Sequence, residues 1–320
     1  MLRLFHQNTI AQSIVILLTV ALLCVRALML SLAPVSSQHF SPIYDLIYDH
    51  LYLMPKLATA ITMVMILLEG IWLNIILINN KITRPHSLMP TLLYTLAMLW
   101  GPDAGTMTPM LIVNALIIGA LGQMLSNGST TLDVSHNFNS AFLVSLASLC
   151  YMPSAYYLLP FIISFSLYKQ YRWRDMAVAF LGLIAPYLLF LTVVFLTDRL
   201  EYNLILMRHD LSDIDIAFNQ TSTLSIVCSV IFVISLLWAL MHEFSTNGEK
   251  NIQQRINTGI LTLPLIACCA IVCFGTLIPF DTQPWAITFA FLVSRLLLAK
   301  RRRLWIGELS LWIIILCAVL

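Results

Sequence analysis

Long apolar runs alternate with short polar segments along the whole chain, and this pattern predicts helices that cross a membrane. About eleven such runs can be separated from one another. They cover residues 11–33, 56–79, 88–100, 109–126, 140–152, 155–168, 176–197, 221–244, 258–280, 285–299 and 304–320. We therefore predict an all-α fold, a polytopic transmembrane helical bundle of about eleven spans.

Two pairs of these runs are short for a bilayer crossing. The first pair is 88–100 with 109–126, and the second is 140–152 with 155–168. A helix that crosses lipid needs about 20 residues, and apolar runs of roughly 10 to 14 usually mark re-entrant or protein-buried segments. We expect both short-helix pairs to be shielded from lipid by neighbouring helices.

Residues 31–55 form the longest polar interruption in the first half of the chain. Ser41 suits the N-cap of a helix and Pro42 its first position. Asp45 and Asp49 are four residues apart, so they share one helical face. Apolar and aromatic residues recur at helical spacing on another face, namely Ile43, Tyr44, Ile47, Tyr48 and Leu51. The pattern predicts an interfacial outer helix, whose two acids either face water or act as a general base or ligands of a divalent metal.

The composition excludes an ordinary soluble protein. Hydrophobic residues make up 60% of the chain and charged residues 10%, with a mean hydropathy of +0.89. Soluble domains carry about 25% charged residues, so most of this chain is expected to lie in a lipid bilayer. The basic residues form no stripe with interleaved aromatic residues, so no nucleic-acid partner is expected.

The distribution of lysine and arginine predicts a cytoplasmic N-terminus. With this orientation, twelve lysines and arginines lie in inner segments and three in outer segments, and basic residues are enriched on the cytoplasmic side of membrane proteins. The same orientation places Asp45, Asp49 and Asp103 outside.

Four charged residues fall inside the predicted spans and more than two positions from their ends, namely Arg26, Glu69, Arg295 and Glu308. A charge in hydrocarbon is costly, so each is expected to have a partner or a polar cavity. We expect Glu69 to face the bundle interior with a polar neighbour, Arg26 being the first candidate. Arg295 and Glu308 both lie near the inner end of the terminal hairpin, where they can pair.

The order of elements in residues 1–197 resembles the seven-span module of the GT-C membrane glycosyltransferases. Residues 140–191 carry this likeness, with a small-residue-rich span, a helix pair, a basic loop and a span containing Gly182 and Pro186 as Gly-x-x-x-Pro. The resemblance divides the chain into this module and residues 198–320, an outer loop with four C-terminal helices. Through residues 79–116 the whole chain also resembles an uncharacterised family of Gram-negative membrane proteins, which implies a bacterial inner membrane.

The resemblance implies a transferase that uses a polyprenyl-phosphate-linked donor at the outer face. Asp45 or Asp49 would then activate the acceptor, and Asp103 would assist or bind a divalent metal. Arg208 and His209 would bind the lipid phosphate, because arginine suits phosphate. This chemistry requires one of Asp45 and Asp49 to lie within about 10 Å of Asp103 across a cavity that Arg208 or His209 borders.

Two other functions are open from the residues. GT-C enzymes usually place an acid directly after the first span, whereas the first acid here, Asp45, lies well into the outer loop. A non-catalytic membrane subunit or scaffold that binds lipid or protein partners has the same pattern. The third alternative is a transporter with Glu69 as its coupling acid.

Overall fold

The computed structural model describes residues 9–30, 34–36, 40–84, 87–100, 105–126, 134–167, 173–198, 201, 203, 205–207, 223–246, 248, 250–274, 283–298, 308 and 311–315. The Arg26 side chain lies outside this description. Every regular element formed by the described residues is a helix, which confirms the all-α prediction.

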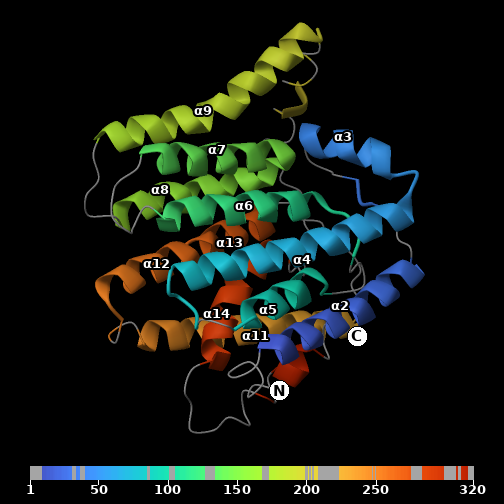
Figure 1. The fold of residues 1–320 in the computed structure, drawn as a ribbon. Helices are drawn as coiled ribbons and strands as arrows, with labels where there is room; N and C mark the ends of the chain where they lie inside the picture. The colour runs from blue at the N-terminus through green and yellow to red at the C-terminus, as the bar shows by residue number, and fades with distance from the viewer. Residues whose placement is uncertain are drawn as a thin grey trace.

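Most of the helices lie side by side with their axes in similar directions (Figure 1). The first half contains α2 (Thr9–Leu30), α3 (Pro42–Leu51), α4 (Pro55–Asn79), α5 (Met89–Met98), α6 (Pro109–Ser126), α7 (Val134–Cys150), η1 (Met152–Tyr157), α8 (Leu158–Leu167) and α9 (Trp173–Leu196). The second half contains α11 (Thr223–Ser245), α12 (Ile252–Thr262), α13 (Pro264–Phe274), η3 (Gln283–Trp285) and α14 (Ala286–Leu298).

Four helical segments are long and apolar enough to cross a membrane, and they fit a membrane protein. These segments are Pro55–Asn79, Pro109–Ser126, Trp173–Leu196 and Ile252–Ile271. Shorter apolar stretches of 10–17 described residues are Gln12–Val25 within α2, Met89–Met98, Met152–Ser164, Val230–Ser245 within α11, and Gln283–Leu298. The count of about eleven spans therefore stays a prediction.

The predicted run 258–280 differs from the observed helices. The helix begins earlier, at Ile252, and is divided at Leu263, where α12 ends and α13 begins with Pro264. Proline has no backbone N–H to donate and its ring clashes with the preceding turn, so it favours the start of a new helix over continuation of the old one. The predicted run therefore covers parts of two successive helices, whose residues Ile252–Ile271 together form one candidate span.

Two short helices form the centre of the bundle. All ten residues of α5 are buried, and in α14 every residue except Arg295 is buried. The two helices pack against each other, and α5 also packs on α4. This burial agrees with the expectation that the short run 88–100 is shielded by its neighbours. In the second predicted pair, α8 exposes Leu159, Ile162 and Ile163, so the shielding expected for that helix is not confirmed.

Helices α7 and α9 approach each other closely at Gly182. A Cβ atom at this position would lie 2.6 Å from the carbonyl oxygen of Phe138 on α7. Nearby, the Ser145 hydroxyl donates a 2.6 Å hydrogen bond to the carbonyl oxygen of Leu183. Small residues and interhelical hydroxyl bonds of this kind hold membrane helices together, since lipid supplies no hydrophobic drive for their association.

Candidate functional site

Helix α3, the predicted outer helix, begins where the sequence predicts. Ser41 is its N-cap and Pro42 its first residue. The Ser41 hydroxyl does not cap a backbone N–H; it donates a 2.8 Å hydrogen bond to Oδ1 of Asp45. Tyr44 is fully buried, whereas Asp45 and Asp49 are exposed, so the two predicted faces of the helix are confirmed.

Backbone and side-chain hydrogen bonds fix α3 to the loop between α5 and α6. The Tyr44 hydroxyl lies 2.7 Å from the carbonyl oxygen of Val35 and 2.9 Å from that of Met107. The Val35 N–H also donates to the Met107 carbonyl, at 3.1 Å. Helix α3 also packs against α4 and α7, next to the loop that follows α5 (Figure 1).

The surroundings of Asp45 raise the pKa of its carboxyl group. Although the residue as a whole is exposed, partial desolvation of its carboxyl group is the main cause of the raised pKa; the neighbouring Asp49 adds to it, and the hydrogen bond from Ser41 opposes it. Burial also raises the pKa of Tyr44, so its hydroxyl stays a neutral donor. A carboxyl group whose pKa moves towards neutral pH is better matched to proton transfer than an ordinary surface aspartate.

Three of the predicted outer-site residues lie outside the described residues, namely Asp103, Arg208 and His209. Met107, which α3 contacts, follows Asp103 by four positions in the chain. The predicted approach of Asp45 or Asp49 to Asp103 therefore stays a prediction, as does the lipid-phosphate site. Among the described residues no group of three or more His, Cys, Asp or Glu side chains is arranged to hold a metal ion.

Glu69 faces the bundle interior and has a polar neighbour, as expected. Its side chain is 3% exposed, and the Tyr94 hydroxyl donates a 2.5 Å hydrogen bond to Oε2. Helix α5 packs closely on α4 beside Glu69 because Gly70 of α4 has no side chain. The Gly70 carbonyl oxygen accepts a 3.1 Å hydrogen bond from the Thr91 hydroxyl of α5. Tyr94 was not predicted as the partner of Glu69. A signal was present, because Thr91 and Tyr94 are three residues apart and so share a face of their helix. The Arg26 partnership stays a prediction.

A second buried acid, Glu243 near the end of α11, was not singled out from the sequence. Arg295 donates to its Oε1 at 2.9 Å, and Lys250 donates to the same oxygen. The expectation for Arg295 considered Glu308 alone and did not anticipate this acid. The three side chains join α11, the loop after it and α14 into one ion network.

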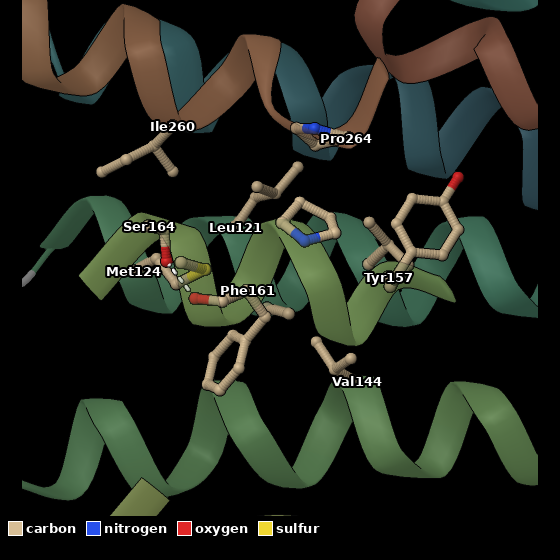
Figure 2. A pocket seen from close by; sticks show the side chains of 11 residues that line it. Leu121, Met124, Val144, Tyr157, Phe161, Ser164, Ile260 and Pro264 are labelled. Atoms are coloured by element: carbon tan, nitrogen blue, oxygen red, sulfur yellow. Dashed lines mark hydrogen bonds between the residues drawn. The ribbon is translucent and has the colours of Figure 1, made fainter. Parts of the chain in front are cut away.

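An apolar pocket lies between α6, α7, α8 and the junction of α12 with α13 (Figure 2). The hydroxyl of Ser164 in its wall is bonded to the Phe161 carbonyl at 2.5 Å, and the hydroxyl of Tyr157 is directed to the Pro284 carbonyl at 3.3 Å. Leu121, Met124 and Val144 contribute further apolar surface. None of the described side chains that line the pocket is charged, and its wall is mainly hydrocarbon.

Comparison with protein-family models, with curated proteins and with solved structures found no match to this chain.

Proposed function

We propose that this chain is a GT-C-like transferase of a bacterial inner membrane, acting at the outer face on a polyprenyl-phosphate-linked donor. The observation that carries the proposal is the attachment of α3 to the loop after α5, through Tyr44, Val35 and Met107. This attachment brings the helix of Asp45 and Asp49 onto the segment that follows Asp103. A transferase needs its acids around one reacting atom, and this arrangement favours that geometry.

The orientation in this proposal is the one that the basic residues predict. A cytoplasmic N-terminus puts α3 and the loop after α5 on the same, outer side of the membrane. Donors linked to a polyprenyl phosphate present their sugar at a membrane surface, where an interfacial helix such as α3 lies. The apolar surfaces of the bundle then face the lipid part of the donor.

Asp45 is assigned as the general base that removes the proton from the acceptor hydroxyl, with Asp49 as its neighbour. The raised pKa of Asp45 suits that role, because proton transfer is most efficient when the pKa of the base lies near the working pH. Asp103 is assigned to assist or to hold a divalent metal, and Arg208 with His209 to bind the phosphate.

Replacing the base tests the proposal. Asp45→Asn is expected to lower the consumption of a polyprenyl-phosphate-linked sugar by about 10²- to 10⁴-fold in membranes enriched in the protein, because it removes general-base catalysis. In the unaltered protein, consumption should fall as the pH drops below the raised pKa of Asp45, since only the ionised carboxylate accepts a proton. Asp198→Asn is the matched control, because Asp198 is an exposed acid at the end of α9.

A non-catalytic membrane scaffold is the second candidate. The observation that favours it is the exposure of both α3 acids, one of which is already engaged by the Ser41 hydroxyl. This alternative predicts equal donor consumption in membranes with and without the protein, and no effect of Asp45→Asn or Asp49→Asn on it. That outcome, with all variants inserted at equal amounts, would replace the transferase by the scaffold.

A further inference from the structure

Glu69 is a buried acid. One of its carboxyl oxygens accepts a hydrogen bond, and the other has no hydrogen-bond partner among the described residues. It lies about 20 Å along α4 from Pro55, at 1.5 Å per residue, and therefore deep in a helix that is long enough to span a membrane. Oε2 accepts the hydrogen bond from Tyr94, and Oε1 is buried without a hydrogen-bond partner among the described residues. Burying a carboxyl oxygen without a hydrogen bond at this depth costs free energy, and this cost indicates that the oxygen binds a ligand.

The described groups that face Glu69 are electrically neutral. Helix α5 contributes Tyr94, and the next titratable group beyond it is Tyr157 of η1. Helix α6 contributes the Asn114 amide, beside the Tyr94 hydroxyl. On α2 the relevant charge is Arg26, whose side chain is outside the described part. An ionised carboxylate with one neutral hydrogen bond would carry a large desolvation cost, and a bound proton removes that cost.

Buried and partly buried polar groups extend from Tyr94 to the loop between α5 and α6. Asn114 donates from Nδ2 to the Gln283 carbonyl oxygen at 3.0 Å, and Thr108 donates to the Gln283 side chain at 2.5 Å. Thr108 follows Met107, the residue that binds the Tyr44 hydroxyl of α3. Oδ1 of Asn114 is buried and has no hydrogen-bond partner in the described part of the protein, so it can accept a hydrogen bond from a water molecule on this route. The polar route therefore leads from Glu69 towards the side of the protein on which α3 lies.

We propose that Glu69 is a proton-binding site in the membrane interior, and that its proton exchanges with the α3 side of the membrane along the route through Asn114. On binding, a proton from water forms an O–H bond at Oε1, and on release it returns to water and leaves the carboxylate. The site is independent of the transferase chemistry assigned to α3. It supplies a protonatable group of the kind that couples proton movement to other events in membrane proteins.

Infrared spectroscopy of the purified protein in lipid nanodiscs tests the bound proton. We expect a protonated-carboxyl band at neutral pH that is lost in Glu69→Gln, a substitution that keeps the side-chain shape. In Tyr94→Phe the band should remain and move to higher frequency, because the carboxyl group loses its hydrogen bond. If Glu69→Gln removes no such band, Glu69 is ionised and the proton site is wrong.

Hydrogen–deuterium exchange of the same band tests the route. Asn114→Leu is expected to leave the band in place and to slow its exchange several-fold, because it interrupts the polar chain. Asn74→Leu is the matched control, since Asn74 is also a buried asparagine with an unpartnered Oδ1, and exchange should then be unchanged. Unchanged exchange in Asn114→Leu, or equal slowing in both variants, would overturn the route.

Discussion

Glu243→Ala is expected to lower the free energy of unfolding by about 3–5 kcal/mol, the cost typical of removing one partner from a buried ion pair. Lys250 and Arg295 both donate to Oε1 of Glu243, which is 5% exposed. Without the carboxylate, two cations remain close together in a largely buried site. Unfolding in mixed micelles of lipid and denaturing detergent, followed by tryptophan fluorescence, measures the change.

Two further variants separate the ion network from a general effect of substitution. Glu201→Ala replaces an exposed glutamate and should change stability by at most about 0.5 kcal/mol. Replacing Glu243 by Leu together with Lys250 and Arg295 by Met should recover most of the loss, because well-packed apolar groups can replace a buried ion network. A Glu243→Ala protein as stable as Glu201→Ala would contradict the account of this network.

Gly182→Ala is expected to weaken the packing of α9 on α7, at a cost of about 1–3 kcal/mol. The added methyl group would lie 2.6 Å from the Phe138 carbonyl oxygen and 3.0 Å from Cβ of Ala141. The first of these atoms belongs to the backbone of α7, so the helices must move apart to admit it. The same unfolding measurement reports the loss.

Gly248→Ala is the matched control for this substitution, because a Cβ at Gly248 meets no atom within 4 Å. We expect its stability to remain within about 0.5 kcal/mol of the unaltered protein. If Gly182→Ala is as stable as Gly248→Ala, α7 and α9 do not approach as closely as the geometry requires.

Hydropathy alone predicted several helices with accurate ends. The run 109–126 coincides with α6, and the run 56–79 differs from α4 by one residue at its start. Both helices begin with proline, and both runs contrast sharply with the polar segments around them. Local signals of this kind are sufficient because a helix satisfies its own backbone hydrogen bonds.

The break between α12 and α13 and the partners of the buried charges were not predicted. Pro264 was overlooked inside a continuous apolar run, although it carries the signal for a new helix. The contacts from Tyr94 to Glu69 and from Arg295 to Glu243 join residues that are 25 and 52 positions apart. Such pairs depend on which helices are neighbours, and hydropathy does not specify neighbours.

Helix α3 likewise has features that local sequence predicts and contacts that it does not predict. Spacing of the residues predicted α3, its N-cap and the separate faces of Tyr44 and Asp45. Its attachment through Val35 and Met107 joins loops 72 positions apart, and no local pattern contains it. The helix that carries Asp45 and Asp49 was therefore predictable from local spacing, while its position over the loop after α5 required the structure. The expected site with Asp103, Arg208 and His209 stays a prediction.

The central claim is that the acids of α3 meet Asp103 at the outer face, and cross-linking in intact cells tests it most directly. Cysteines replace Asp49 and Asp103 in a protein whose own cysteines are replaced by serine or alanine, and a membrane-impermeant bifunctional reagent about 10 Å long is added outside, a length matched to acids that share one reacting site. The account predicts an efficient intramolecular cross-link with both cysteines present and none with either cysteine alone. Two cysteines that each react from outside but remain unlinked would contradict the shared site, and protection of both from the reagent would contradict the outer location.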